Sequence, residues 1–520
     1  MTERSAPWWE QRWAVAALAL LSAVPLLWPD IPPLVDLPGH MGRYRVQLEI
    51  DSNETLRQFY SFDWALIGNL GVDLLVIPLA KIFGLELAVK LIVLTIPPMT
   101  VAGFLWVARE VHGRVPPTAL FAVPLAYNFP FLFGFVNFAL SMAFAFLAFA
   151  LWLRLARLGR LKLRAALFVP ISIVLWVTHT FGWGTLGVMA FSAELVRQHD
   201  RGRSFLVAGF RAGLHCLSMA LPLLLMVAWR NGAVAGQTAD MFNWPAKFRW
   251  LIMTLRDRWY AFDFGSLFLL IGLVALLPLR KGIGFSRNLL ASGLFLLLVY
   301  LLLPRIVFGS AYADMRLVPY MLAVFVLALR VHEGAGLRLM QGLAIAGLAF
   351  LLVRTAATTI SFRLYDRSYD RELAAIHHIP QEARLVSFVG SQCRQSWAMH
   401  RLEHLPAIAL VRKRAFSNDQ WSMAGAQLLT ARYQAGSGFE RDPSQIVGPV
   451  QCRGELWRSL DHSLANFPRD AFDYVWLIAP PRYDPALTEG LEPVWRSGSS
   501  VLFRVEDRSP PAASAAKEAR

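Results

Sequence analysis

The stretch that decides the fold is Leu140-Ser-Met-Ala-Phe-Ala-Phe-Leu-Ala-Phe-Ala-Leu-Trp-Leu153, which carries no charge. Comparable apolar stretches occupy residues 205–229 and 339–352. Stretches of this kind approach the ~20 residues that a helix needs to cross a hydrocarbon core of about 30 Å. The chain is also 56% hydrophobic and only 17% charged, which is unlike a soluble enzyme of 520 residues. The sequence therefore predicts a polytopic α-helical membrane protein.

The net charge of +15 comes largely from short loops between the apolar stretches. Residues 154–164 form a basic loop with no acid, which is typical of a cytoplasmic loop and not of a nucleic-acid groove. Residues 13–28 end without a small-x-small cleavage site, so we expect an uncleaved first span. We expect about eleven transmembrane helices, with the N-terminus in the cytoplasm and the C-terminus outside. They are placed near residues 13–29, 87–108, 117–131, 134–153, 165–178, 181–196, 205–228, 264–279, 288–303, 316–330 and 339–359.

The sequence predicts two domains and a tail. Residues 1–360 form the transmembrane domain, whose first outer loop runs from about residue 30 to residue 85. Within that loop, residues 62–83 are hydrophobic but interrupted by Asp, Gly, Asn and Pro, so we expect an interfacial or re-entrant helix. Residues 361–508 are expected to form a small extracytoplasmic α/β domain, and residues 509–520 to be disordered.

Three short apolar runs carry the expectation of an α/β domain. Residues 384–389, 474–479 and 500–505 are strand-like in length and composition. Cys393 and Cys452 lie in the same domain, where a bacterial periplasm would permit a disulfide. Two unpaired thiols remain the alternative. The expected location is the bacterial inner (plasma) membrane, with the C-terminal domain in the periplasm.

A polar cluster follows the first apolar span, in Asp36-Leu-Pro-Gly-His40-Met-Gly-Arg43. A carboxylate beside the bilayer, shielded from bulk water, can take a proton from an acceptor hydroxyl. If this stretch is helical, His40 shares a face with Asp36. The alternative is that Asp36 caps a short helix whose start is marked by Pro38. Both roles are compatible.

Three basic residues and one acid are expected on the outer side of the membrane. His179 falls between two short spans, where it is either structural or able to hydrogen-bond a phosphate. Arg305 and Arg316 run against the usual charge bias of outer loops, so each needs a local reason. Arginine suits phosphate because its planar fork donates two parallel hydrogen bonds. The alternatives are an ion pair with Asp314 or contact with lipid headgroups.

Aromatic residues gather in the outer segment 230–263. Trp244 and Trp259 are candidates for packing against a sugar ring, together with Arg43 of the first loop. An interfacial aromatic belt is the alternative interpretation.

This layout resembles that of the GT-C class of bacterial membrane glycosyltransferases that use polyprenyl-phosphate sugars. The resemblance is carried by Asp36 with His40 in a long first outer loop, by His179, and by the late Asp-x-Arg of Asp314 and Arg316. Short paired spans and an extracytoplasmic C-terminal domain add to it. It implies an inverting transfer of a sugar from a polyprenyl-phosphate donor to a glycan, lipid or protein acceptor. Asp36 would act as base, and Arg316, Arg305 and His179 would hold the donor phosphate.

One departure from the pattern concerns a metal. Many members of the class carry a second acid in the next outer loop, whereas residues 127–137 contain none. The sequence therefore assigns no metal ligand, and a divalent cation (Mg²⁺ or Mn²⁺) is left open. Membrane lipids and the lipid-linked donor are the expected partners, and nucleic acid is not.

Two other classes of function compete with the transferase. A transporter or flippase of a lipid-linked glycan would need a polar path, and the predicted spans carry almost no charge at mid-depth. A non-catalytic membrane scaffold would tolerate replacement of Asp36.

Overall fold

The computed structural model describes residues 6–230, 238–307, 309–393, 396–422 and 427–509. Of the predicted disordered tail, residues 510–520 lie outside the described residues. The chain divides into two compact units. The first, here called the helical unit, contains residues 1–28, 66–75 and 90–361, and the second, the sheet unit, contains residues 29–65, 76–89 and 362–520. Each is described separately below.

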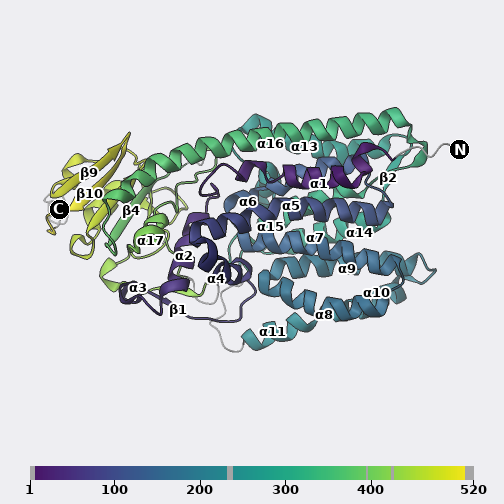
Figure 1. The fold of residues 1–520 in the computed structure, drawn as a ribbon, viewed down its shortest axis with the longest axis horizontal. Helices are drawn as coiled ribbons and strands as arrows, with labels where there is room; N and C mark the ends of the chain where they lie inside the picture. The colour runs from purple at the N-terminus through teal and green to yellow at the C-terminus, as the bar shows by residue number, and fades with distance from the viewer. Residues whose placement is uncertain (1–5, 231–237, 308, 394–395, 423–426, 510–520) are drawn as a thin grey trace. The chain divides into compact units, whose positions relative to one another are not determined.

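The helical unit is built from apolar helices, several of which lie side by side in Figure 1. Helix α7 packs on α8 and α9, α9 packs on α14, and α14 packs on α15. A two-stranded antiparallel ribbon joins β2 to β3. The elements lying wholly or mainly in this unit are α1 (Arg12–Leu21), α5 (Leu85–His112), α6 (Phe129–Phe133), α7 (Val136–Arg157), α8 (Leu161–Thr178), α9 (Thr180–His199), α10 (Phe205–Cys216), α11 (Leu221–Arg230), α12 (Trp244–Ile252), α13 (Tyr260–Leu276), α14 (Arg287–Leu302), α15 (Ala313–Ala328), α16 (Leu337–Leu373), β2 (Ile283–Phe285) and β3 (Leu329–Val331).

All eleven stretches predicted as spans contain helix, and the chain is a multi-pass membrane protein. The number of crossings is not confirmed. Among the described residues, five helices are long and apolar enough to span a membrane, or six if the bent pair α10 and α11 counts as one span. Those five are Leu85–His112, Val136–Arg157, Leu161–Thr178, Tyr260–Leu279 and Leu337–His378.

Two of the predicted spans are irregular, and proline accounts for both. The stretch 205–228 breaks between α10 and α11 with a bend of 66°. Pro222 follows the break, and its ring and missing N–H prevent one continuous helix through this point. The stretch 117–131 is mostly a 3-10 helix, η3 (Pro117–Tyr127), with Pro124 inside it. The remaining short 3-10 helices are η1 (Trp8–Glu10), η2 (Val24–Leu26), η4 (Leu217–Met219), η5 (Met253–Leu255), η6 (Leu277–Leu279), η7 (Glu333–Ala335), η8 (Ala374–His378), η9 (Gln434–Gly436), η10 (Arg469–Ala471) and η11 (Pro485–Thr488).

The segment predicted as re-entrant forms helix α4 (Gly71–Phe83), which at 13 residues is shorter than the ~20 needed to cross a bilayer. Its beginning belongs to the helical unit, where Leu70 N donates to Val177 O at 2.8 Å. Gly71 is required by this approach, because a Cβ there would lie 2.5 Å from Thr178 Cγ2. The start of α4 is therefore attached to the junction between α8 and α9.

The sheet unit contains a mixed six-stranded sheet of order β7-β6-β4-β8-β10-β9. The pairs β4–β6, β4–β8 and β6–β7 are parallel, whereas β8–β10 and β10–β9 are antiparallel. A separate antiparallel pair joins β1 to β5. The elements of this unit are α2 (Leu37–Glu49), α3 (Glu54–Phe59), the end of α4, α17 (Ala407–Lys413), α18 (Leu460–Asn466), β1 (Tyr60–Phe62), β4 (Leu385–Gly390), β5 (Leu429–Ala431), β6 (Ile446–Gly448), β7 (Arg458–Ser459), β8 (Tyr474–Ile478), β9 (Leu491–Ser497) and β10 (Ser500–Val505).

The three predicted strands are confirmed as β4, β8 and β10. They are buried along almost their whole length because they occupy the middle of the sheet. Val386, Val475 and Phe503 belong to one buried hydrophobic cluster, which also includes Val46 of α2 and Phe59 of α3.

The unit boundary differs from the predicted domain boundary in one respect. The helical unit ends at residue 361, and residues 362–520 belong to the sheet unit. However, residues 29–65 and 76–89, which we grouped with the membrane domain, cluster with the C-terminal residues. The physical reason is that α2 and α3 place Val46, Leu56 and Phe59 in the core under the sheet, which a sequence-local view of the first loop cannot reveal.

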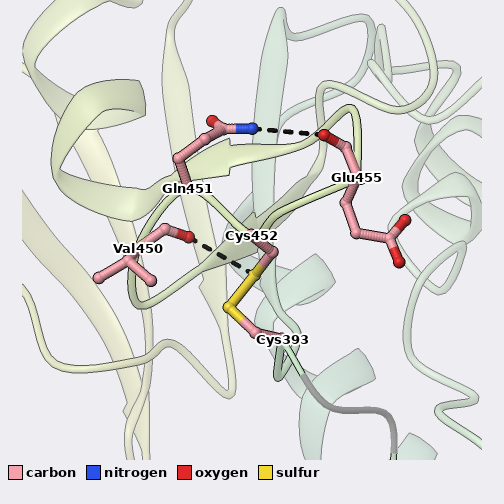
Figure 2. The surroundings of a disulfide bond; sticks show 5 residues. All are labelled: Cys393, Val450, Gln451, Cys452 and Glu455. Atoms are coloured by element: carbon pink, nitrogen blue, oxygen red, sulfur yellow. Dashed lines mark hydrogen bonds between the residues drawn. A yellow bond between two sulfur atoms is a disulfide. The ribbon is translucent and has the colours of Figure 1, made fainter.

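A disulfide joins Cys393 to Cys452, 59 residues apart in the chain (Figure 2). The loop after β6 that carries Cys452 is compact, since Gln451 Nε2 donates to Glu455 O at 3.3 Å. Gly448, the last residue of β6, has no room for a side chain, because a Cβ would lie 3.0 Å from Cys452 Sγ. The disulfide thus ties the segment after β4 to the segment after β6.

Candidate functional site

The polar motif of the first loop forms the start of helix α2. The stretch is therefore helical, which was the condition for Asp36 and His40 to share a face. Asp36 is the N-cap residue, and His40 N donates to Asp36 O at 3.0 Å. Pro38 fits in the first turn, where a backbone N–H has no intrahelical partner. Within the described residues, the Asp36 side chain makes no capping hydrogen bond. Asp36 is therefore a cap by position, and its carboxylate serves another contact.

Two glycines of the motif let α2 approach the segment that follows β4. A Cβ at Gly39 would lie 2.8 Å from Trp421 Cη2 and 3.1 Å from His404 Nδ1. A Cβ at Gly42 would lie 2.7 Å from Gln420 Nε2. The spacing of three residues places both glycines on one helix face. This face brings the N-terminus of α2 against a histidine that sequence reasoning did not single out.

His404 is the centre of a buried cluster of acids within the sheet unit. Its Nε2 lies 4.0 Å from Asp36 Oδ1 and 3.9 Å from Asp442 Oδ1. Its Nδ1 lies 3.9 Å from Asp419 Oδ2 and 3.1 Å from the backbone oxygen of Asp419. The imidazole is 3% exposed, so the three carboxylates surround a ring that water hardly reaches. We call these four residues the His404 cluster.

The charges of the His404 cluster depend on one another. Burial disfavours the charged imidazole, but the attraction of Asp442, Asp36, Asp419 and Glu403 outweighs it, so the pKa of His404 is raised. Burial raises the pKa of Asp419 and of Asp442, and the charge of His404 opposes that rise. An imidazolium stabilises the ionised form of a carboxylate about 4 Å away. The cluster therefore favours His404 in its charged form.

Asp419 is fixed by hydrogen bonds in addition to its contact with His404. Ser417 Oγ donates to Asp419 Oδ1 at 2.7 Å, and Ala407 N donates to Asp419 Oδ2 at 3.0 Å. The second bond satisfies an N–H at the start of α17. Asp419 therefore has a structural role. Asp36 is the carboxylate of the cluster that lies at the start of α2.

His40 and Arg43 belong to the same unit but make different contacts. The imidazole of His40 packs on Trp421, with ring centroids 4.9 Å apart. Arg43 is buried, lies over the ring of Tyr44 and donates to Gln427 Oε1 at 3.4 Å. Both residues belong to α2, the helix that Asp36 begins. Arg43 is buried, whereas we expected it to contact a sugar.

A second polar group lies in the helical unit, where His179 meets Arg316. The two residues are 137 positions apart in the chain, and His179 Nε2 lies 3.4 Å from Arg316 Nη1. His179 occupies the single residue between α8 and α9, and Arg316 lies in the first turn of α15. The guanidinium also packs over the ring of Phe135, 4.3 Å from its centroid. The structure therefore brings together two of the predicted phosphate-binding residues.

The hydrogen bonding of His179 determines what its outer nitrogen can do. Phe181 N donates to His179 Nδ1 at 3.1 Å, so the ring caps helix α9. A neutral imidazole accepts through one ring nitrogen and donates through the other. The capping bond therefore leaves the proton on Nε2, and Nε2 meets Arg316 Nη1 as one donor facing another. An acceptor atom placed between them would receive hydrogen bonds from both.

Arg305 and Asp314 have other ion-pair partners. Arg305 pairs with Asp240, and Asp314 Oδ2 lies 3.3 Å from Lys247 Nζ. Lys247 also donates to Leu303 O at 2.7 Å. Among the described residues, the ion-pair partner found for Asp314 is a buried lysine of α12.

Trp244 and Trp259 lie at the beginnings of helices in the helical unit. Trp244 starts α12 and is exposed, with its ring 6.0 Å from that of Phe242. Trp259 is the N-cap residue of α13 and is also exposed. Exposure permits either of the two interpretations, sugar packing or an interfacial belt.

Asn137 ends the stretch in which we noted the lack of an acid and lies in the first turn of α7. Asn137 Nδ2 donates to Asp73 Oδ2 and to Asn69 O, both at 2.9 Å. Its Oδ1 accepts from Val72 N at 2.6 Å. Asn137 therefore holds the start of α4, and Asp73 is a structural acid of the first loop rather than a rival to Asp36.

No cluster of metal-ligand side chains is assembled among the described residues. None of their His, Cys, Asp and Glu side chains form a group of three or more placed to hold an ion. The three acids closest to that arrangement surround the His404 imidazole instead. We therefore derive no step through a metal.

His404, Asp419 and Asp442 were missed because nothing in their local sequence is unusual for a soluble domain. The available signal was weak. It consists of the run 400–404, charged or polar except for Leu402, before Leu-Pro, and of the polar run 417–420 between Phe416 and Trp421.

No protein-family model matches the chain, and no curated protein matches it. Two solved structures are similar to it. The crystal structure of ArnT from Cupriavidus metallidurans in the apo state has 12% identity and a TM-score of 0.46, with 94% of this chain and 96% of that chain covered. The crystal structure of the same protein bound to undecaprenyl phosphate has 11% identity and a TM-score of 0.43, with the same coverage.

Proposed function

We propose that the protein is a membrane glycosyltransferase that moves a sugar from a polyprenyl-phosphate donor to an extracytoplasmic acceptor. Asp36 is the general base, and His179 and Arg316 hold the donor phosphate. The protein lies in the bacterial inner membrane, with its N-terminus in the cytoplasm and the sheet unit in the periplasm.

The observation that carries this proposal is the contact between His179 and Arg316. Two N–H donors that face each other at 3.4 Å have a use when an anion accepts from both. Arg316 is only 7% exposed and is surrounded by Phe135, Phe138 and Phe181, whose faces favour a cation. An oxygen of a phosphate fits this arrangement because it accepts several hydrogen bonds and carries charge.

A lipid phosphate suits the position of this pair better than a soluble phosphate. His179 immediately follows α8, whose apolar side chains, such as Leu167 and Val174, are exposed as lipid-facing side chains would be. The other end of α8 lies within the basic stretch 154–164, which connects it to α7. A phosphate headgroup would thus lie at the end of α8 that is opposite the basic stretch, and its tail would lie along exposed apolar helices. This arrangement matches a polyprenyl phosphate in the outer leaflet.

The proposed role of Asp36 is supported by its neighbours in the sheet unit. An imidazolium 4.0 Å away favours the carboxylate form that a base requires. Arg401, which donates to Pro33 O, holds the chain just before Asp36. His404 is a positioning residue in this account, because it acts on the substrate only through Asp36.

The proposed step is a single displacement. Asp36 takes the proton of an acceptor hydroxyl as the hydroxyl oxygen bonds to the anomeric carbon. The bond from that carbon to the lipid phosphate oxygen breaks, and the electron pair stays on the phosphate. Arg316 and His179 stabilise the charge that develops there. The anomeric configuration is inverted.

Two features support the proposed topology. Loop 154–164 is basic and contains no acid, as in a cytoplasmic loop. The disulfide between Cys393 and Cys452 suits an oxidising compartment such as the periplasm.

The test is a mass-spectrometric profile of surface glycans and lipid-linked sugars in cells. It compares the intact protein, a deletion, Asp36→Asn and the control Asp30→Asn, which alters an exposed acid six residues earlier. Expression of each variant is checked. We expect the deletion and Asp36→Asn to lose the same glycosyl unit and to accumulate its lipid-linked donor, whereas Asp30→Asn matches the intact protein.

The other outcomes distinguish the competing functions. If the deletion changes the profile and Asp36→Asn does not, Asp36 is structural and a flippase or transporter gains support. If neither changes the profile, the transferase proposal fails and a scaffold is favoured.

A further inference from the structure

We propose that a pocket of the sheet unit, formed by residues 438–444 and 456–458, binds the acceptor through an uncharged saccharide. This inference rests on the proposed function and narrows its acceptor from glycan, lipid or protein to a sugar-bearing molecule. The pocket has a volume of about 220 Å³ and is partly open to solvent. It is smaller than the sites of about 300–1,000 Å³ that enclose drug-sized ligands, so it would hold only a small part of the acceptor.

The chemistry of the pocket wall matches a saccharide. Its lining residues include two acids (Glu440 and Asp442), two arginines (Arg441 and Arg458) and Trp457. An indole offers an apolar face for the C–H side of a sugar ring. Carboxylates and guanidiniums are planar groups that accept from and donate to neighbouring hydroxyls.

The charge balance of the wall argues against a strongly charged ligand. Two carboxylates and two guanidiniums give the lining residues no formal net charge. A phosphate in this pocket would face both carboxylates, and a cation would face both guanidiniums. Hydroxyl groups use both kinds of side chain without leaving a charge unpaired.

The polar side chains of the wall are held in place before any ligand binds. Gly438 N donates to Glu440 Oε2 at 2.6 Å, and Gln445 Nε2 donates to Asp442 Oδ1 at 2.8 Å. Arg458 lies over the ring of Phe439, 4.6 Å from its centroid. Fixed side chains lose little freedom on binding, which improves affinity for a small polar ligand.

Asp442 connects this pocket with the proposed base. It lines the pocket and also lies 3.9 Å from His404 Nε2, the nitrogen that faces Asp36 at 4.0 Å. Asp442 and Asp36 therefore each place a carboxylate oxygen within 4.0 Å of the same nitrogen. A saccharide in the pocket is held next to the cluster that contains the base, as an acceptor must be.

The test is binding of the full-length protein, in detergent, to an array of bacterial-envelope oligosaccharides and simple hexose glycosides. Binders are then quantified by saturation-transfer NMR. We expect at least one saccharide to bind, and Glu440→Gln and Arg441→Ala each to weaken it at least tenfold. Asp36→Asn should bind the saccharide normally, and so should the control Arg504→Ala. Arg504 lies on β10 and pairs with Glu492 of β9.

Formation of the Cys393–Cys452 disulfide, measured by alkylation and mass, verifies the fold of each variant. The inference is overturned if no saccharide binds, or if binding is unaffected by Glu440→Gln and Arg441→Ala. If a saccharide binds but Asp36→Asn does not change the cellular glycans, the proposed transferase function is overturned and the saccharide site is retained. Loss of the glycosyl unit in Asp36→Asn cells without array binding would overturn the saccharide site alone.

Discussion

The two units of this protein each bury a histidine, and the two histidines have opposite neighbours. His404 lies in the sheet unit within 4.0 Å of three carboxylates. His179 lies in the helical unit, 3.4 Å from the guanidinium of Arg316. Both are less than a tenth exposed, so each ring is controlled by protein rather than by water.

The difference shows that neighbours, not residue type, decide the chemistry. Acids around His404 favour a proton on the ring, and the resulting charge supports Asp36 as a carboxylate. At His179, the capping bond from Phe181 places the proton of a neutral ring on Nε2. In the proposed function, one histidine therefore supports the base, and the other offers a donor to the phosphate.

The largest expected effect tests the charge of His404. His404→Gln removes the cation of the His404 cluster, so its buried carboxylates lose their positively charged partner. We therefore expect the free energy of unfolding of the sheet unit to fall by about 3–5 kcal/mol. His179→Gln should cost much less, since it removes no charge. Thermal unfolding followed by tryptophan fluorescence measures both, because Trp476 is buried in the sheet.

A double variant provides the control for His404→Gln. Asp419→Asn in the His404→Gln background removes one of the buried charges and should restore part of the lost stability. If His404→Gln is no more destabilising than His179→Gln, the contrast between the two histidines is wrong.

The contrast was only partly accessible from the sequence. His179, Arg316 and Asp36 stood out because each is a polar residue next to an apolar span. Strands β4, β8 and β10 were predictable from short runs of β-branched and aromatic residues. His404, Asp419 and Asp442 were not, because their cluster is assembled by contacts across 368, 15 and 38 positions for Asp36, Asp419 and Asp442, respectively. The two glycines of α2 explain why Asp36 reaches that cluster, but only once Trp421 is in place.

The next effect concerns the approach of α2 to His404. Gly39→Ala places a methyl group 2.8 Å from the ring of Trp421, so we expect a loss of about 1–3 kcal/mol from overpacking. Gly213→Ala is the matched control, because a Cβ in that part of α10 meets nothing within 4 Å and alanine favours helix. Chemical denaturation of both variants measures the difference. Equal stability would mean that α2 does not need this contact.

A smaller effect tests the donor role of His179. His179→Gln removes the ring N–H that we propose donates to an oxygen of the phosphate. We therefore expect the affinity for undecaprenyl phosphate to fall about tenfold. Native mass spectrometry of the protein in nanodiscs measures the affinity. The control is His199→Gln, an exposed histidine at the other end of α9. An unchanged affinity in His179→Gln would leave the ring with its capping role alone.

The smallest effect is the pH dependence of the sheet unit. The folded protein raises the pKa of His404, which Asp36, Asp419, Asp442 and Glu403 face. Its stabilising contribution is therefore complete below the unfolded value of about 6.5 and is lost as pH rises through the folded value. The raised pKa values of Asp419 and Asp442 act in the same direction, starting from their unfolded value of 3.8.

We accordingly expect the unfolding free energy to fall as pH rises above 6.5, by at most about 1.4 kcal/mol per pH unit for each proton involved. His404→Gln should flatten this fall, and His179→Gln should not. A slope that is the same in both variants would place the titrating group elsewhere.

The proposed function assigns the lipid phosphate to His179 and Arg316 and the base to Asp36. The measurement that tests it most directly is the affinity of the full-length protein, Asp36→Asn and Arg316→Gln for undecaprenyl phosphate in nanodiscs. The account predicts that Asp36→Asn binds as tightly as the unaltered protein, although it transfers no sugar in cells, and that Arg316→Gln binds at least tenfold more weakly. Equal binding by all three proteins, or loss of binding in Asp36→Asn, would contradict it.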